Sequence, residues 1–316
     1  MQYKLKKIAG DASFREFYRI QKGNISSVII LAKKDKFRNL TTYSAINEIL
    51  DKNGILAPKL LSDFTNENII EVTDFGKISF YDFIKNKKNK FKHYKKLIDL
   101  IIKIQKINLK KEYKFKKIKI KFDKYHINNL KAESNLFFDW YLKYLFTIKK
   151  NKKIENKIRK ELDRLYKKLY FRNRYFTHRD FHASNIMIFR GKPGLIDSQD
   201  AIIGNPLYDV VSLIDDVRIK ISQQTKDRLF NYYLTRTKFE KKKSKNDFDI
   251  LSIQRNLKIL GIFTRLHVRD KKSSYLKFFP YTWKLIEMRL KNPIFLNLKT
   301  LIDELVSKTK RKRKIF

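Results

Sequence analysis

The first 76 residues carry short apolar segments with the length and alternation of β-strands. Phe17–Ile20 alternates apolar and polar side chains, while Ser27–Ala32 and Asn68–Asp74 are mostly apolar runs of the kind found in buried strands. Between them, Leu40–Asn53 places apolar residues at helical intervals and is followed by a glycine, a common end of a helix. The pattern therefore predicts a small sheet with one helix.

The following residues, 77–308, have a predominantly helical pattern. Helices are expected at Ser79–Asn86, Phe91–Asn108, Phe137–Ile148, Ile154–Phe171, from a turn at Ile203–Asp209 to about Ile219, and throughout 223–308. One exception is Lys110–Lys124, in which lysines are interspersed with Tyr, Phe and Ile, and which predicts a loop or a ribbon. The basic end of the chain, 309–316, is expected to be disordered. Together these elements predict an α+β protein.

A segment of short strands interrupts the helices and carries three polar residues at informative spacing. Tyr175–Thr177 and Ile186–Phe189 have the pattern of strands that hold a loop between them. Asp180 lies in this loop, Asn185 follows it five positions later, and Asp197 comes about a dozen residues after that, behind an apolar run. An isolated Asp in a polar loop would mean little, but three such residues in strand-loop-strand order are rarely accidental.

These three side chains suit phosphoryl transfer. A carboxylate such as Asp180 can orient an attacking hydroxyl group and accept its proton. Magnesium prefers hard oxygen ligands, and Asn185 and Asp197 supply an amide and a carboxylate oxygen. The spacing is that of the protein-kinase catalytic loop followed by a metal-binding Asp. The sequence therefore predicts a phosphotransferase that uses ATP and Mg²⁺, with Asp180 as the base.

The nucleotide contacts are expected in the amino-terminal sheet. A hairpin turn at residues 10–13 would cover the phosphates, but it has one glycine, so backbone amides, the Ser13 hydroxyl and Arg15 would have to bind them. An ordinary hairpin with a surface arginine is the alternative. Lys33, at the end of a strand, is the candidate for the lysine that contacts the phosphates, and Glu48 on the next helix could pair with it. In so lysine-rich a chain, Lys33 could equally be a solvated surface residue.

Composition limits the other classes of function. The chain has 316 residues, 74 Lys and Arg against 32 Asp and Glu, and a formal net charge of +42. The excess is mostly Lys, is spread along the chain and accompanies abundant Ile and Asn; because all three have A/T-rich codons, genome composition explains it without a specific nucleic-acid partner. Cysteine is absent, which excludes disulfides and thiolate chemistry. No signal-peptide core or bilayer-length apolar run is present, so we expect a cytoplasmic protein without a membrane partner.

Four stretches resemble one known family. They are GDASFREFYR at 10–19, HRDFHASNIM at 178–187, LIDSQDAIIGNPLYDVVSLIDD at 195–216 and RNLKILGIFTRL at 255–266. In this order they resemble the aminoglycoside phosphotransferase and choline kinase superfamily, and most closely its anomeric N-acetylmuramate and N-acetylglucosamine kinases of peptidoglycan recycling. The resemblance implies a bilobal protein-kinase-like fold, with a nucleotide-binding lobe at 1–76 and a catalytic and substrate lobe at 77–308.

The resemblance also implies roles for individual residues. Asp180 would be the base, with Asn185 and Asp197 as magnesium ligands, in direct in-line transfer from ATP to the C1 hydroxyl of an amino sugar. The sugar would bind near His182, Gln199 and Arg265. His178 and Asp209 are expected to have structural roles, Asp209 by accepting backbone hydrogen bonds from the catalytic loop. Ser198 departs from the family, which usually has an aromatic residue at its position.

Two other functions stay open at this level. The substrate could be another hydroxyl compound, such as an aminoglycoside, choline or homoserine; a cationic substrate needs carboxylates, and Asp215 and Asp216 offer them. Alternatively, the chain could be a catalytically idle fold that binds nucleic acid, which its charge favours. The presence of Asp180, Asn185 and Asp197 argues against an idle fold, since such a fold has no physical need for them. A monomer is favoured, although the sequence does not decide the oligomeric state.

Overall fold

A computed structural model describes residues 4–8, 15–23, 25–32, 38–145 and 151–312. The chain divides into two compact units. The first, called here the amino-terminal unit, comprises Met1–Asp123 and Tyr175–Ile203; the second, called the helical unit, comprises Lys124–Arg174 and Gly204–Phe316.

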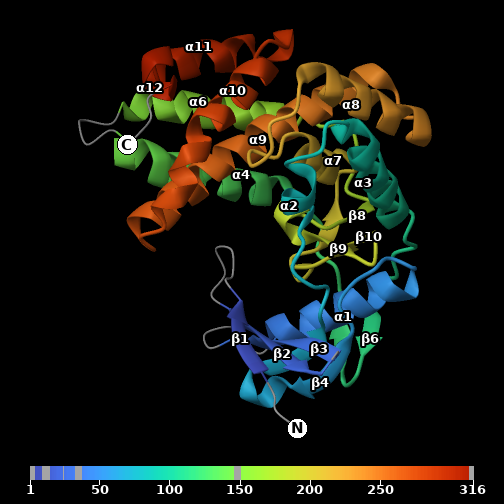
Figure 1. Ribbon diagram of the computed structural model, residues 1–316. Helices are drawn as coiled ribbons and strands as arrows, with labels where there is room; N and C mark the ends of the chain where they lie inside the picture. The colour runs from blue at the N-terminus through green and yellow to red at the C-terminus, as the bar shows by residue number, and fades with distance from the viewer. Residues whose placement is uncertain (1–3, 9–14, 24, 33–37, 146–150, 313–316) are drawn as a thin grey trace. The chain divides into compact units, whose positions relative to one another are not determined.

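A five-stranded antiparallel sheet begins the amino-terminal unit (Figure 1). In spatial order its strands are β1 (Lys4–Ile8), β2 (Glu16–Lys22), β3 (Ile25–Leu31), β5 (Ile69–Thr73) and β4 (Leu60–Phe64). One apolar cluster joins Ile30, Ile70 and Val72 of the sheet to Leu40 and Tyr43 of helix α1 (Arg38–Lys52). Burial of this cluster fixes the helix on the sheet, as the helical spacing of its apolar residues predicts.

The rest of this unit consists of short elements. They are η1 (Thr65–Glu67), α2 (Phe80–Ile84), α3 (Lys90–Gln105), β6 (Tyr113–Phe115), β7 (Ile118–Ile120), β8 (Tyr175–Thr177), η3 (Ala183–Asn185), β9 (Ile186–Phe189), β10 (Lys192–Leu195) and β11 (Ile202–Gly204), whose last residue belongs to the helical unit. Strands β6 and β7 pair antiparallel, so of the two alternatives expected at Lys110–Lys124, a loop or a ribbon, the ribbon is the one that forms. Strands β9 and β10 form a hairpin, and Gly191 turns it with φ +74°, a backbone conformation that favours glycine.

The helical unit is built around one long, buried helix, α9 (Lys241–Val268). The other helices are α4 (Ile127–Leu136), the π-helix η2 (Phe137–Leu142), α5 (Lys143–Leu145), α6 (Lys152–Tyr166), α7 (Leu207–Ile214), α8 (Gln223–Thr237), η4 (Ser273–Phe278), α10 (Phe279–Arg289), η5 (Pro293–Phe295), α11 (Leu296–Leu305) and α12 (Lys308–Lys312). Helix α9 packs against α4, η2, α7 and α10. Where α9 passes Leu136, the last residue of α4, a Cβ on Gly261 would lie 2.3 Å from the Leu136 carbonyl carbon, so only glycine fits.

The basic end of the chain differs from its expected disorder. Residues Lys308–Lys312 form α12, and Arg311 is buried. Its guanidinium donates to the Ile302 carbonyl at 3.0 Å and to the Asp303 carboxylate at 2.6 Å, and it lies 5.0 Å from the ring centre of Trp283. A buried guanidinium needs hydrogen-bond acceptors, and Arg311 finds them here. These contacts hold α12 against the rest of the helical unit. Residues 313–316 lie outside the described part of the chain.

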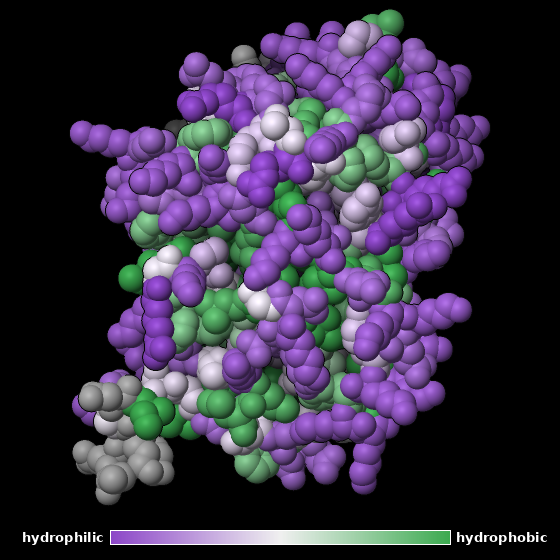
Figure 2. Space-filling model, turned by 90° about the vertical axis from the view of Figure 1, so that its right-hand side faces the viewer, coloured by the Kyte–Doolittle hydropathy of each residue, from purple (hydrophilic) through white to green (hydrophobic). Residues whose placement is uncertain are grey.

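The predicted α+β fold, a small sheet with one helix followed by a largely helical remainder, is confirmed. The lobe boundary at residues 76–77 stays a prediction. The two compact units divide the chain differently, because the amino-terminal unit includes β8 to β10 as well as the sheet. None of the helices in the described ranges combines the length and the apolar character of a membrane-spanning segment. The molecular face in Figure 2 is mostly hydrophilic, and apolar residues show between the polar ones in separate patches.

Candidate active site

The loop between β8 and β9 has a fixed backbone. The His182 amide donates to the Asp180 carbonyl at 2.9 Å, and the Asn185 amide donates to the His182 carbonyl at 2.9 Å. Arg179 and Asp197 have φ values of +75° and +63°, in the left-handed region that residues with a Cβ rarely adopt. Each such residue costs of order 1–3 kcal/mol and persists only where its surroundings determine it. Backbone strain of this kind is typical of functional sites.

The three residues predicted to carry the chemistry lie together. The Asn185 side-chain amide nitrogen donates to the Asp180 carbonyl at 3.2 Å and lies 3.5 Å from Asp197 Oδ2. Partial burial raises the pKa of Asp197, and the negative charge of Asp180 raises it further. The spacing read from the sequence therefore corresponds to a real cluster in the amino-terminal unit, although the roles of its members stay predictions.

This cluster fits a divalent cation. Burial is the main cause of the raised pKa of Asp197 and the charge of Asp180 the next, and a cation bound between these side chains would favour the ionised carboxylate against both. Within the described ranges, no set of three His, Cys, Asp or Glu side chains is arranged to hold a metal. Asn185 and Asp197 would thus supply few ligands, as is usual for magnesium, which keeps water and phosphate oxygens in its coordination sphere.

Two further side chains hold Asp197. Gln199 Nε2 donates to Asp197 Oδ1 at 2.9 Å, and Gln199 Oε1 accepts from Arg15 Nη1 at 3.1 Å. Arg15 is buried, with its Nη1 3.7 Å from Asp197 Oδ1. Its charge opposes the rise in the Asp197 pKa. Gln199 therefore positions the predicted metal ligand; its contact with a sugar stays a prediction.

Ser198 ties the same segment to helix α1. Its hydroxyl donates to Asn47 Oδ1 at 2.6 Å, and both side chains are buried. Next to Asn47, burial raises the pKa of Tyr43 to about 12. Ser198, which stands where the family usually has an aromatic residue, thus makes a buried hydrogen bond instead. Sequence reasoning noted Ser198 and missed Asn47, whose position on the buried face of α1 was the available signal.

The predicted nucleotide contacts are mostly beyond the described residues. Ser13 and Lys33 lie outside them, so the pairing of Lys33 with Glu48 is untested. Glu48 is exposed and forms an ion pair with Lys52, one helical turn further along α1. All three contacts with the nucleotide stay predictions.

The two histidines of the loop lie in different environments. His178 is fully buried, and its ring packs edge-on against Phe181 with the ring centres 6.1 Å apart, which suits the structural role predicted for it. His182 is also buried, with Nε2 3.4 Å from the side-chain nitrogen of Asn185. His182 therefore adjoins the predicted magnesium ligand, and its contact with a sugar stays a prediction.

Asp209 and Arg265 belong to the helical unit. Asp209 is buried in the first turn of α7, as expected of a structural carboxylate. Arg265 is half-buried on α9; burial and the nearby Arg269 lower its pKa. The predicted hydrogen bonds from the catalytic loop to Asp209 and from Arg265 to a sugar stay predictions.

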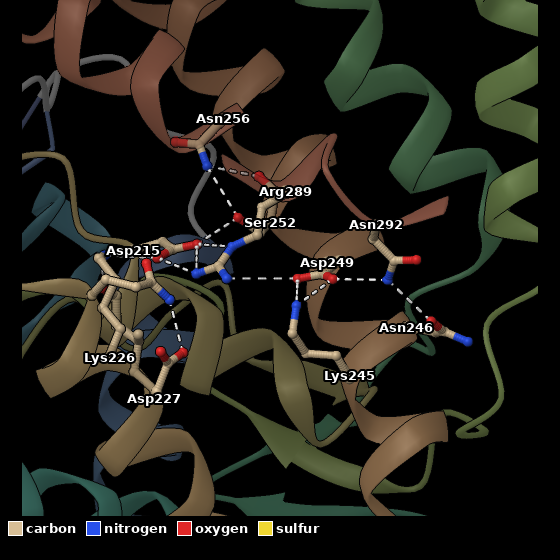
Figure 3. A network of polar contacts seen from close by, with 12 residues as sticks. Asp215, Lys226, Asp227, Lys245, Asn246, Asp249, Ser252, Asn256, Arg289 and Asn292 are labelled. Carbon is tan, nitrogen blue, oxygen red and sulfur yellow. Dashed lines mark hydrogen bonds and ion pairs between the residues drawn. The ribbon is translucent and has the colours of Figure 1, made fainter. Parts of the chain in front are cut away.

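Asp215, the first residue of the acidic pair after α7, is bound by two cations of the protein itself (Figure 3). Asp215 has no exposed side-chain surface, and its carboxylate accepts from Lys226 Nζ at 2.7 Å and from Arg289 Nη2 at 2.8 Å. These two cations hold the pKa of Asp215 far below its usual range, against the effect of burial. Asp216 is also buried and lies 3.5 Å from Arg218. The carboxylate of Asp215 is therefore buried and already bound by two cations, so it is not available to a cationic substrate.

Comparison with known proteins decides the family. Residues 4–241 match the model of the phosphotransferase enzyme family. The chain belongs to this family. The curated relatives of this phosphotransferase include the N-acetylmuramate/N-acetylglucosamine kinase of Pseudomonas aeruginosa, 26% identical over 88% of the chain and 81% of the relative. The enzyme of the same name from Neisseria meningitidis is 26% identical over 84% of the chain and 80% of the relative.

Solved structures agree on the fold. A choline/ethanolamine kinase family protein from Mesorhizobium loti superposes with a TM-score of 0.64 at 11% identity, covering 95% of this phosphotransferase and 92% of the other chain. A spectinomycin phosphotransferase superposes with a TM-score of 0.62 at 13% identity, covering 90% and 92%. The kinase-like fold and the class of ATP-dependent phosphotransferases, both predicted from the sequence, are confirmed.

Proposed function

We propose that this phosphotransferase transfers the terminal phosphoryl group of ATP to the anomeric C1 hydroxyl of N-acetylmuramate, N-acetylglucosamine or both. The observation that carries the proposal is the similarity to curated kinases for these two sugars over most of the chain. The cluster of Asp180, Asn185 and Asp197 supports it, because this chemistry needs a base beside ligands for a cation. A role in peptidoglycan recycling and a cytoplasmic location are part of the same proposal.

Asp180 has the central chemical role in this mechanism. Its carboxylate would accept a hydrogen bond from the sugar hydroxyl, orient one oxygen lone pair towards the phosphorus and take the proton as the new P–O bond forms and the bond from that phosphorus to the departing ADP breaks. An anomeric hydroxyl is more acidic than the other hydroxyls of a sugar, which suits a carboxylate base.

Asn185 and Asp197 would hold magnesium, which when bound neutralises the charge of the phosphates. Gln199 and Arg15 fix the direction of the Asp197 carboxylate through the contacts of 2.9, 3.1 and 3.7 Å described above. Positioning and charge stabilisation, without a covalent enzyme intermediate, would provide most of the rate enhancement.

The competing functions are less well supported. A cationic acceptor such as choline or an aminoglycoside needs available carboxylates, and Asp215 is already paired with Lys226 and Arg289. An idle fold that binds nucleic acid would not need Asp180 and Asp197 close enough to affect each other's charge. Homoserine lacks a net charge and is tested in the same assay as the sugars.

A substrate panel tests the proposal directly. Purified protein would be incubated with magnesium, ATP and, separately, N-acetylmuramate, N-acetylglucosamine, choline, homoserine and kanamycin, and ³¹P NMR would follow the products. We expect a sugar 1-phosphate from at least one amino sugar. Phosphorylation of choline, homoserine or kanamycin alone would refute the sugar assignment, and retention of generic DNA at high salt without any ATP consumption would favour the idle fold.

Asp180→Asn tests the base. We expect kcat to fall by about 100- to 10,000-fold, the range for loss of general-base catalysis, while ADP still binds. The matched control is Asp139→Asn, which makes the same chemical change at an exposed carboxylate of η2. Unchanged turnover in Asp180→Asn, with the control also active, would exclude Asp180 as the base.

A further inference from the structure

The segment Asp74–Gly76, which follows β5, is held to the sheet by one arginine. Arg19 of β2 donates two hydrogen bonds to the Asp74 carboxylate, one of them 2.9 Å long, and another to the Gly76 carbonyl at 2.7 Å. Burial acts to raise the pKa of Asp74, but the hydrogen bonds from Arg19 and from the Gly76 amide hold this pKa below its usual value. Asp74 is therefore ionised and already paired, unlike the Asp of the Asp-Phe-Gly triplet in protein kinases, which holds magnesium.

Phe75, between the two residues that Arg19 binds, packs on the hairpin of β9 and β10. Its ring stacks on Phe189, the last residue of β9, with the ring centres 5.1 Å apart. On β10, a Cβ on Gly194 would lie 2.7 and 2.9 Å from two carbon atoms of the Phe75 ring. Both Phe75 and Gly194 are buried. Because Gly194 has no side chain, the Phe75 ring lies directly on the backbone of β10.

The same hairpin carries the two predicted metal ligands at its open end. Asn185 directly precedes β9, and Asp197 lies two residues after Leu195, the last residue of β10. The Ile196 amide donates to the Asn185 carbonyl at 3.1 Å, so the backbones that lead to the two ligands are joined there. A shift of the hairpin away from Phe75 would therefore move both ligands together.

We propose that Arg19, Asp74 and Phe75 are positioning residues, which set the place of Asn185 and Asp197 relative to the sheet. The inference rests on the proposed function, in which these two ligands hold magnesium. Arg19 lies on β2, the strand that follows the turn at residues 10–13 predicted to cover the phosphates. A metal that bridges the phosphates has to meet its protein ligands and the nucleotide at once, and functional groups of this kind need placement within about 0.5 Å. The chain from Arg19 through Phe75 to the hairpin provides such a connection.

Gly194→Ala and Arg19→Lys perturb the two ends of this connection. The new methyl group of Gly194→Ala pushes β10 and the Phe75 ring apart, while Arg19→Lys keeps the positive charge and loses the paired hydrogen bonds. Calorimetric titration of the intact protein with ADP, with and without magnesium and well below the melting temperature of each variant, measures how much the metal tightens binding. We expect magnesium to tighten ADP binding in wild type. In both variants this gain should fall by about tenfold, as for other residues that orient metal ligands, with ADP binding unchanged when magnesium is absent.

Two matched controls make the same chemical changes away from Phe75. Arg190→Lys alters an exposed arginine at the turn of the same hairpin. Gly23→Ala alters a glycine with φ +56° after β2, where a Cβ would meet nothing within 4 Å, so it adds backbone strain and no new contact. Both controls should keep the gain from magnesium that wild type shows.

The outcomes separate this inference from the proposed function. The inference is overturned if both variants keep the gain, if the controls lose as much, or if ADP affinity falls equally with and without magnesium, because the effect would then lie on the nucleotide. If Gly194→Ala does not fold, Arg19→Lys decides alone. Absence of any gain in wild type would refute the metal role of Asn185 and Asp197, and with it both the inference and this part of the proposed function.

Discussion

Replacing Asp215 by Asn should destabilise the helical unit strongly. The substitution keeps the size of the side chain and removes the negative charge that lies 2.7 Å from Lys226 and 2.8 Å from Arg289. Both cations are almost completely buried, so neither can turn to water when its partner is lost. Breaking a buried ion pair by removing one partner costs about 3–5 kcal/mol, and we expect a loss of unfolding free energy in that range.

Urea unfolding followed by tryptophan fluorescence measures this loss. Both tryptophans, Trp140 and Trp283, lie in the helical unit, so the signal reports on that unit alone. With a slope of about 2–3 kcal/mol per molar urea, a loss of about 3–5 kcal/mol lowers the midpoint by about 1–2.5 M. Asp163→Asn is the matched control, because Asp163 also pairs with two lysines, Lys131 and Lys167, but at the surface, where its loss should hardly move the midpoint.

The pH dependence has a definite sign. The pKa of Asp215 is lower in the folded state than in the unfolded state, so the stability it provides is complete above the ordinary carboxylate range and is lost as the pH falls through the folded-state pKa. The gap between wild type and Asp215→Asn should stay constant from pH 7 to 5 and narrow only in strong acid. Lys226→Met added to Asp215→Asn should restore part of the stability. A midpoint for Asp215→Asn no lower than that of Asp163→Asn would refute this account.

Three further substitutions test packing and positioning. Gly261→Ala should destabilise the helical unit by about 1–3 kcal/mol, although alanine normally stabilises a helix, because the new methyl group meets the Leu136 backbone; a raised urea midpoint would show that the helices can separate. Asn47→Ala should lower the unfolding free energy by about 1–3 kcal/mol, because it leaves the buried Ser198 hydroxyl without its acceptor. It should also lower kcat more than it raises KM for ATP. Kinetics equal to those of wild type would show that α1 does not help to position Asp197. Arg311→Ala should lower the urea midpoint clearly more than Lys308→Ala, since Arg311 is buried and Lys308 is exposed; similar midpoints would mean that α12 does not stabilise the unit.

The success of the sequence interpretation depended on how local each signal was. Helix α1 and strands β3 and β5 were predicted within about two residues, because each buries a continuous apolar face that shows in the sequence. Strand β4 was missed: it is an edge strand, partly exposed, and Ser62 and Asp63 interrupt its apolar pattern. The helix expected from Phe137 begins ten residues earlier, at Ile127, because polar residues such as Glu133 are buried there by tertiary hydrogen bonds.

The same distinction applies to the candidate site. Asp180, Asn185 and Asp197 lie within one strand-loop-strand segment, so their spacing alone predicted that they would meet. The contact of Arg15 with Gln199 joins residues 184 positions apart, and no local pattern encodes it. Asp215 was equally ambiguous, because its environment is decided by Arg289, 74 positions later.

The distribution of carboxylates gives the large positive charge a structural meaning. Several of the 32 acidic residues are buried in the helical unit, among them Asp215, Asp249 and Glu133, each paired with a cation. Among the described residues, nine Asp and Glu side chains are buried against six Lys and Arg side chains, so the surface has a slightly larger excess of cations than the composition alone suggests. Unpaired surface lysines repel one another and attract anions, and both effects weaken as salt rises. Moderate salt should therefore stabilise this fold while weakening non-specific binding of polyanions, and the buried pairs, which salt screens little, should keep their contribution.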